Sequence, residues 1–384
     1  MAAMYLEQYY IHHDIAQAKY FFPSVFTSTS LLQLEMDSLF KQSWLLVPNS
    51  ENTIDSISDK VKIRGTYYPT NLLDEPLILW RDYKENKLHC YSNVCSHAWY
   101  SLINGTGRSS QIHCEQHGRV FHCSGKCVSH KGFDKSQLGS EVNLKEFGLG
   151  EWEQFLFANF TPNNDKPFQY IVDEMLPIFE NVSLKDLSRM PHTQEHRIVY
   201  GNWKQYAMNF LDSYHLEFIH PGPGGLVDVY DMPTYTTECG NNILFQWVYT
   251  KNPEHGLPVD LVPDRLKHEE KRIFALYCFV FPNMAFNLYP WGLGVYMWMP
   301  TDDPLKTNYY WYQYVLDEEK FQKRNDIWLA QMVNDEDVDA MNRACAGLKS
   351  NFIERGQFAI DKEQGPHWFS QLLYTTMREN TIES

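Results

Sequence analysis

Apolar residues recur at helical spacing near the start of the chain. Between residues 31 and 45 (LLQLEMDSLFKQSWL), leucine, methionine and phenylalanine follow one another every three or four positions. This spacing places them on one face of a helix, so the segment is predicted to be an amphipathic helix. It belongs to a first region, residues 1–44, that we expect to be helical.

The pattern changes between about residues 60 and 160, where β-prone residues gather in short runs. Glycine, asparagine and serine break these runs, as is typical of strands joined by turns. We predict a small all-β module that ends with a strand over residues 153–159, and we place its boundary at residue 160. The other predicted strands are VKIRG, PLILWRDY, KLHCYSNV, QIHCE and RVFHC.

The remaining chain, residues 161–384, combines helices with long strands. Residues 198–220 have helical character and lead into PGPGG at 221–225, where proline and glycine cannot easily continue a helix. Residues 318–350 are helical again by periodicity. Between them lie the β-prone runs ILFQWVYT, YCFVFPNMAFNLYP, GVYMWMP and NYYWYQYV. This order has no parallel βαβ pattern and predicts an α+β fold with a large antiparallel sheet.

Composition narrows the class of protein. The 384 residues are 43% hydrophobic and 21% charged, as in ordinary globular proteins. We find neither a run of 18 apolar residues nor a secretory signal, and we therefore expect no membrane segment and a cytoplasmic location. The net charge of −15 argues against binding nucleic acid phosphates. Eight cysteines in such a chain suggest metal ligands more than a disulfide scaffold.

Two cysteines and two histidines form the first candidate metal site. Cys95-x-His97 is followed, after sixteen residues, by Cys114-x-x-His117. Two thiolates and two imidazoles on two loops of a β-module are the ligand set of a Rieske [2Fe–2S] cluster. A structural zinc site is the alternative, but zinc ligands usually come as a cysteine pair and a histidine pair. Each loop here carries one of each residue, which favours the cluster.

Two further cysteines, Cys123 and Cys127, lie just beyond this pattern. They could form a disulfide or supply additional ligands. We interpret them as buried free thiols, which behave as small hydrophobic side chains.

A second candidate site has the pattern D-x-x-H-x-x-x-x-H, formed by Asp212, His215 and His220. The two histidines lie about 140° apart around an ideal helix, so they can bind one metal only if the helix distorts or ends. Two histidines and a carboxylate make the facial triad of non-heme Fe(II) oxygenases, which leaves coordination positions open. Asp212 is placed to accept the other N–H of His215, so we interpret it as a relay residue rather than a ligand.

The third ligand is ambiguous from spacing alone. The sequence NDEDVD at residues 334–339 offers Asp337 as the candidate, and its neighbours Asp335, Glu336 and Asp339 are rivals. A run of acidic residues is also typical of a solvated helix face.

Together these motifs resemble the Rieske ring-hydroxylating oxygenase α-subunit family. The resemblance extends from about residue 25 to about residue 375 and is closest to the choline monooxygenase and betaine or carnitine oxygenase branch. Glu336-Asp337, followed ten residues later by Gly347-Leu348, resembles the family's carboxylate helix and favours Asp337. The other matching residues are the two cysteine–histidine pairs, Asn202-Trp203-Lys204, Asn209, Asp212-x-x-His215, His220 and Phe281-Pro282-Asn283.

The resemblance implies a Rieske domain at residues 45–160 and a helix-grip catalytic domain at 161–384, on which residues 1–44 pack. It assigns the [2Fe–2S] cluster to Cys95, His97, Cys114 and His117, and the mononuclear Fe(II) to His215, His220 and Asp337. Asn209 and Asp212 become catalytic residues, with Asp212 bridging a cluster histidine and His215 between subunits of a head-to-tail homotrimer.

The implied activity is that of a terminal oxygenase. It would use O₂ and electrons from NAD(P)H, delivered by a separate ferredoxin or flavin reductase, and the chain indeed has no glycine-rich nucleotide motif after a strand. The substrate would be a small organic molecule that is hydroxylated or oxidatively N-demethylated. A quaternary ammonium compound would suit an aromatic cage from residues 277–298 and 309–314, although these rings could equally be sheet core.

Two other functions stay open at this point. One is the α subunit of a dioxygenase that forms cis-diols on aromatic rings, and the other is a non-catalytic Rieske electron-transfer or regulatory protein. The chain also departs from the family pattern at Ala98-Trp99, Glu115-Gln116, Arg119 and Met208. Residues 105–136 carry five Lys or Arg against two acidic residues, which suggests a docking surface for an acidic electron carrier or an ordinary solvated surface.

Overall fold

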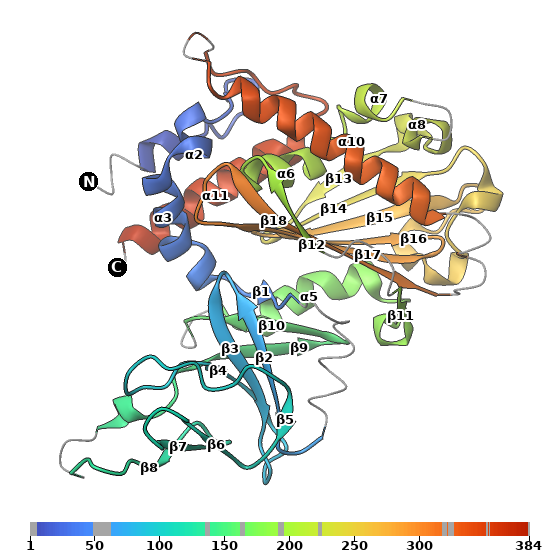
Figure 1. Cartoon of the computed structure of the whole chain (residues 1–384). Coiled ribbons are helices and arrows are strands. Elements are labelled where there is room, and N and C mark those ends of the chain that lie inside the picture. The colour runs from blue at the N-terminus through green and yellow to red at the C-terminus, as the bar shows by residue number, and fades with distance from the viewer. Residues whose placement is uncertain are drawn as a thin grey trace. The chain divides into compact units, whose positions relative to one another are not determined.

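Two compact units make up the chain in the computed structural model (Figure 1). The small unit is Lys41–Lys166, and the large unit is Met1–Phe40 with Pro167–Ser384. The mixture of a β-module with an antiparallel sheet and helices confirms the predicted α+β class. The structure describes residues 6–48, 63–134, 139–161, 166–190, 196–221, 225–316, 321, 326–350, 352 and 354–382.

Two antiparallel sheets form the small unit. The larger has the order β1-β10-β9-β4-β3-β2-β5, and the smaller is β6-β7-β8. Buried side chains of both sheets, among them Trp80, Tyr91 and Phe121, share one core. The strands are β1 Leu45–Leu46, β2 Thr66–Leu72, β3 Glu75–Arg81, β4 Leu88–Ser92, β5 Gly107–Arg108, β6 Gln111–His113, β7 Val120–His122, β8 Cys127–Ser129, β9 Glu146–Trp152 and β10 Phe155–Asn159.

One predicted strand of this unit is wrong. Residues 63–65 of the VKIRG run form a bend and a turn, while residues 61–62 lie outside the described part of the chain. Gly65 has a φ of +80°, a left-handed conformation that ends extended pairing, so the strand begins only at Thr66. The predicted strand over 153–159 is confirmed for Phe155–Asn159, which form β10, while residues 153–154 form the turn before it.

An antiparallel sheet of eight strands forms the large unit. Its order is β11-β18-β17-β16-β15-β14-β13, and β12 also pairs with β18. The predicted run YCFVFPNMAFNLYP is two strands, because Pro282 has no N–H with which to continue a ladder. The strands are β11 Ser188–Arg189, β12 His196–Tyr200, β13 Thr236–Cys239, β14 Ile243–Tyr249, β15 Ile273–Val280, β16 Met284–Tyr289, β17 Gly292–Pro300 and β18 Lys306–Val315.

Helices cover both faces of this sheet. In Figure 1, α6 and α10 lie on one face and α5 on the other, so β15 is buried along its whole length. The helices are α2 Pro23–Thr27, α3 Thr29–Ser38, α5 Phe168–Phe179, α6 Trp203–Leu211, α7 Leu216–Ile219, α8 Leu226–Val229, α10 Asp326–Gly347 and α11 Gln364–Ile382. The sequence patterns predicted α3 and α10 but neither α5 nor α11. Within the described segments, no helix is long and apolar enough to cross a membrane.

The predicted helix over residues 198–220 is three separate elements. Residues up to Tyr200 belong to β12, which pairs with β18. Asn202 then caps α6, because its side chain accepts the N–H of Lys204 and the Gln205 side chain accepts the N–H of Asn202. The helix stops at Leu211, and the chain turns helical again only in α7.

The start of α6 is fixed by a buried ion pair. Glu35 of α3 and Lys204 are both completely buried, and Lys204 Nζ donates to both carboxylate oxygens at 2.6 and 2.9 Å. Tyr9 Oη and Trp203 Nε1 also donate to Glu35, at 2.5 and 2.8 Å. Burial lowers the pKa of Lys204, and the charge of Glu35 opposes this effect. Glu35 therefore ties the N-terminal segment to α6.

Removing this carboxylate should destabilise the large unit strongly. Glu35→Ala leaves the Lys204 ammonium buried without its counter-charge, and we expect a loss of about 3–5 kcal/mol in urea denaturation. Gln33→Ala, on the exposed face of the same helix, is the control and should cost less than about 1 kcal/mol. Equal effects of the two substitutions would contradict the anchoring role.

Candidate metal centres

The two cysteine–histidine loops of the small unit have the same backbone design. The N–H of Trp99 bonds to the carbonyl of Cys95, and the N–H of Gly118 bonds to that of Cys114, at 3.2 and 2.9 Å. Trp99 and Gly118 both have positive φ, +56° and +72°. Each loop is thus a tight turn that begins at a buried cysteine and exposes the following histidine. The sequence pattern does not reveal the left-handed Trp99.

The structure brings the predicted cluster residues together as two pairs, the two cysteines and the two histidines. Cys95 and Cys114 are buried in the shared core and lie within side-chain hydrogen-bonding contact of each other. Burial, followed by this contact, raises the pKa of Cys95. The rings of His97 and His117 lie 4.7 Å apart, centre to centre. Two sulfur donors inside and two nitrogen donors outside suit a cluster with thiolates on one iron and imidazoles on the other.

Two residues that depart from the family pattern cross-link the loops. Arg119 is buried, donates to Ser96 Oγ at 3.0 Å and lies over the Phe133 ring at 5.1 Å. Glu115 accepts a hydrogen bond from the Tyr100 hydroxyl at 3.3 Å. Both contacts join the Cys114 loop to the Cys95 loop, which explains how these departures are compatible with the site.

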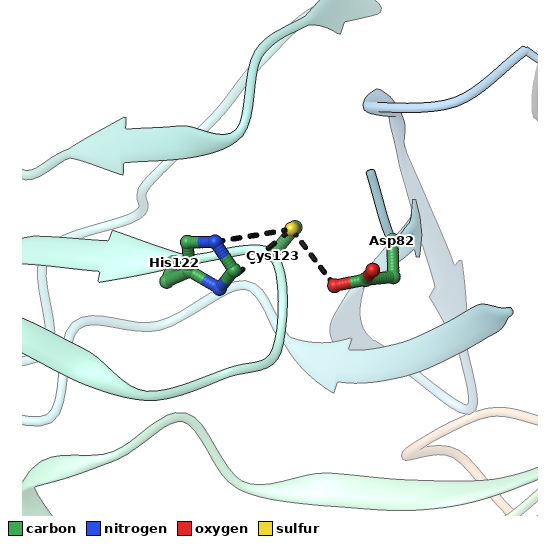
Figure 2. Close-up of side chains that lie close together, drawn as sticks. All are labelled: Asp82, His122 and Cys123. Carbon is green, nitrogen blue, oxygen red and sulfur yellow. Dashed lines mark hydrogen bonds between the residues drawn. The ribbon is translucent and has the colours of Figure 1, made fainter. Parts of the chain in front are cut away.

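Cys123 is a buried free thiol, as interpreted from the sequence, and it lies between Asp82 and His122 (Figure 2). Its sulfur donates to Asp82 Oδ2 at 3.0 Å and lies 3.6 and 3.7 Å from the two ring nitrogens of His122. Burial, with the hydrogen bond to Asp82, raises the pKa of Cys123 to about 11, so the thiol keeps its proton. Cys127 is also free and is half-buried, so neither cysteine forms a disulfide.

The predicted facial triad of the large unit also comes together. His220 Nε2 lies 3.2 Å from Asp337 Oδ1 and His215 Nε2 lies 3.6 Å from the same oxygen. The helix ends before His215 and again before His220, which is the interruption that the five-residue spacing required. Of the PGPGG run that was expected to end the helix, residues 222–224 lie outside the described chain.

The nitrogen and oxygen atoms of the triad are better placed to bind a metal ion than to form hydrogen bonds with one another. His220 Nε2 is fully buried and, among the residues that the structure describes, has no hydrogen-bond partner of good geometry. Such an atom costs stability unless a ligand satisfies it. Burial raises the pKa of Asp337, but the close approach of His220 and the charge of His215 outweigh it and lower the pKa. An anionic carboxylate with two imidazoles is the donor set for non-heme Fe(II).

Each rival carboxylate has another partner. Asp335 pairs with Arg197 at 2.7 Å, and Asp339 pairs with Arg343 at 2.8 Å. Glu336 accepts a hydrogen bond from His220 Nδ1 at 2.6 Å. This contact directs Nε2 of the same ring away from Glu336 and toward Asp337. Sequence spacing had offered Glu336 only as a rival ligand.

Asn209 and Asp212, the two predicted catalytic residues, both lie beside the triad. Asn209 Nδ2 donates to Asp337 Oδ1 at 2.9 Å. Asp212 Oδ2 lies 3.4 Å from His215 Nδ1, while its other oxygen accepts the N–H of Tyr214 at 2.6 Å. Each histidine therefore has a carboxylate on its Nδ1 atom, the arrangement that orients imidazole ligands.

A cavity of about 80 Å³ opens onto the triad. Of the described residues that line it, none is a lysine or an arginine. Only part of the predicted aromatic wall takes part, because strand residues alternate between faces: Tyr309 lines the cavity, whereas Tyr312 packs against Arg189. The aromatic lining residues are Tyr206, Phe210, Tyr235, Tyr277, Tyr289, Tyr296, Trp298 and Tyr309.

Comparison with known proteins identifies the class. Residues 184–379 match the model of the ring hydroxylating alpha subunit (catalytic domain), and residues 53–147 match the Rieske [2Fe-2S] domain. The chain therefore belongs to the ring-hydroxylating oxygenase α-subunit family. It is the terminal oxygenase component of a Rieske-type system, with a [2Fe–2S] cluster, a mononuclear iron and O₂ as co-substrate. This sets aside the zinc site and the non-catalytic protein.

Relatives of known function include two monooxygenases. Choline monooxygenase of Arabidopsis thaliana is 28% identical over 92% of this chain and 82% of its own. The carnitine monooxygenase oxygenase subunit of Acinetobacter baumannii is 26% identical over 89% of each chain. Among solved structures, a quaternary ammonium Rieske monooxygenase described with inter-subunit electron transfer has a TM-score of 0.72 at 19% identity, covering 94% of this chain and 95% of that one. Naphthalene 1,2-dioxygenase from Rhodococcus has a TM-score of 0.72 at 16% identity, covering 100% and 98%.

The assignment of Asp337 can be tested by iron content. Asp337→Ala removes the shared carboxylate, so iron should fall from about three atoms per chain to about two, with the cluster's absorption retained. Asp335→Ala and Asp339→Ala are matched controls, because these carboxylates pair with arginines instead. Loss of iron in a control but not in Asp337→Ala would transfer the ligand role.

Proposed function

We propose that this oxygenase hydroxylates or oxidatively N-demethylates a small quaternary ammonium compound. The observation that carries the proposal is a cavity beside the triad that, within the described part of the chain, is lined by eight aromatic side chains and by no lysine or arginine. Aromatic faces attract a cation, whereas a nearby ammonium or guanidinium would repel it. The names of the choline and carnitine relatives support the same substrate class.

The size of the cavity favours a compact substrate. The cavity beside the triad is small, at about 80 Å³. A compact ammonium head with a short arm suits it better than two fused aromatic rings. Naphthalene 1,2-dioxygenase has a similar fold, so an aromatic-ring dioxygenase is the alternative function. The cavity makes it less favoured than oxidation of an ammonium compound.

Two sets of residues would bind the two metal centres. Cys95, His97, Cys114 and His117 would hold the cluster, and His215, His220 and Asp337 would hold the iron. When bound, the cluster provides electrons and the iron provides open positions for O₂ and substrate.

The surrounding side chains would keep this site in shape. Asn209 fixes the Asp337 carboxylate, and Glu336 and Asp212 orient the two imidazoles. The rings of Phe210, Trp298 and their neighbours would bind the cation and keep bulk water away from the reacting atoms.

We further propose that electrons pass between subunits of a homotrimer through Asp212. Exposed aromatic residues lie beside both ends of this path: Trp99 is 87% exposed next to the cluster loop, and Phe218 is 65% exposed on α7. Large exposed aromatic side chains are typical of surfaces that become buried in an assembly. Asp212, half-buried and beside His215, would bridge His215 and a cluster histidine of another copy.

Electrons would reach the cluster from a separate ferredoxin or flavin reductase that uses NAD(P)H. Arg108, Lys126 and Lys131 are exposed and could attract an acidic carrier. Arg119 is buried and cannot contribute to such a surface, and Lys135 lies outside the described residues.

Turnover tests the substrate class. With a reductase and NADH, choline-like ammonium compounds should stimulate O₂ consumption and yield a hydroxylated or demethylated product in equal amount, measured by an oxygen electrode and mass spectrometry. Naphthalene serves as the comparison substrate and should not be converted. Formation of a cis-diol from it, with no product from any ammonium compound, would favour the dioxygenase reading.

The relay role of Asp212 needs a separate measurement. Asp212→Ala should abolish coupled turnover while iron content and cluster absorption stay at wild-type levels, because the residue is placed between the centres and is not a ligand. Glu217→Ala, an exposed acidic residue on the neighbouring helix, is the control and should retain activity. Coupled turnover at the wild-type rate in Asp212→Ala would refute the relay.

A further inference from the structure

Three lining residues of the cavity carry a buried polar atom without a hydrogen-bond partner in the described part of the chain. They are His220 at Nε2, Asn287 at Oδ1 and Asn334 at Nδ2. The iron accounts for the first of these atoms. The other two are an acceptor and a donor without a partner of good geometry among the described residues, although Asn334 also lies close to the Tyr296 side chain.

The two asparagines reach the cavity from different elements. Asn287 lies on β16 and is 2% exposed, and its Nδ2 donates to the Tyr289 hydroxyl at 3.4 Å, which leaves Oδ1 as the free acceptor. Asn334 lies on α10 and is 5% exposed. It is three residues before Asp337 and therefore on the same face of that helix. One amide thus comes from the sheet and the other from the helix that carries the carboxylate ligand.

A bound group that is both donor and acceptor would satisfy both amides. We propose that Asn287 and Asn334 form a subsite for an uncharged hydroxyl group of the substrate, which donates to Asn287 Oδ1 and accepts from Asn334 Nδ2. This inference rests on the proposed ammonium substrate and adds its second functional group. The substrate class becomes a small amino alcohol with a quaternary nitrogen.

A carboxylate does not fit the same atoms. It can accept from Asn334, but it has no proton for Asn287 Oδ1 and would repel that oxygen. Among the residues that the structure describes, no lysine or arginine lines the cavity to neutralise its charge. An ammonium compound that ends in a carboxylate should therefore bind less well than the alcohol of similar size.

Equilibrium binding to the iron-loaded enzyme tests this subsite without requiring turnover. The probes are choline, ethyltrimethylammonium, which lacks the hydroxyl, and glycine betaine, which has a carboxylate. A site built to hydrogen-bond a hydroxyl rejects analogues that lack it, so calorimetry should show choline binding at least about 100-fold more tightly than ethyltrimethylammonium. In Asn287→Ala and Asn334→Ala this ratio should fall below about 10, mainly through weaker choline binding.

Asn283→Ala is the matched control. Asn283 is completely buried and its Oδ1 also has no partner among the described residues, but it does not line the cavity. The control should keep the choline preference. If the variants do not fold, the wild-type enzyme still tests the donor contact, because the O-methyl ether of choline cannot donate to Asn287 and should bind at least about 10-fold more weakly than choline.

The outcomes separate this inference from the proposed function. Equal binding of choline and ethyltrimethylammonium would overturn the hydroxyl subsite and leave the cation-binding cavity intact. Tighter binding of glycine betaine than of choline would also overturn it, in favour of a carboxylate subsite. Failure of every ammonium compound to bind would overturn the proposed substrate class itself, and the subsite with it.

Discussion

The candidate iron site depends on the contacts of a single carboxylate oxygen. Oδ1 of Asp337 lies 2.9 Å from Asn209 Nδ2, 3.2 Å from His220 Nε2 and 3.6 Å from His215 Nε2. A carboxylate taken out of water is costly unless donors or positive charge surround it. Helix α10 can place Asp337 here only because α6 and the segment after it bring the other three groups to the same point. A divalent cation bound there would satisfy the carboxylate and both imidazoles together.

That convergence depends on an interrupted helix with a fixed beginning. Asn202 caps α6, and Lys204 is held by the buried carboxylate of Glu35, so the first turn cannot shift along its axis. The helix then ends at Leu211, and the short α7 that follows sets the direction of both histidines. An uninterrupted helix would point the two rings to different sides. The site therefore requires both the fixed start of α6 and the end of that helix at Leu211.

The cluster site reaches a similar result with loops instead of helices. Two turns of matching backbone geometry bury a cysteine at their base and expose a histidine. The contacts of Arg119 and Glu115 between these loops show how unusual residues can preserve a common ligand set. In both centres the cysteine or histidine donors lie where regular structure ends, whereas Asp337 projects from the middle of α10.

The sequence by itself determined the two ligand patterns, the β-module and the antiparallel sheet, because metal chemistry and strand alternation leave local signatures. It could not choose among Asp335, Glu336, Asp337 and Asp339, because four acidic residues on one helix differ only in what the rest of the fold presents to them. The fold distinguishes them by their contacts: Asp335 pairs with Arg197, Glu336 accepts from His220 Nδ1, and Asp337 lies beside both histidines. Packing also turned residues 198–200 into a strand, since β18 offered an open edge. Likewise, only the tertiary structure placed Asn287 and Asn334 at one cavity, because a pairing between a strand and a distant helix has no trace in local spacing.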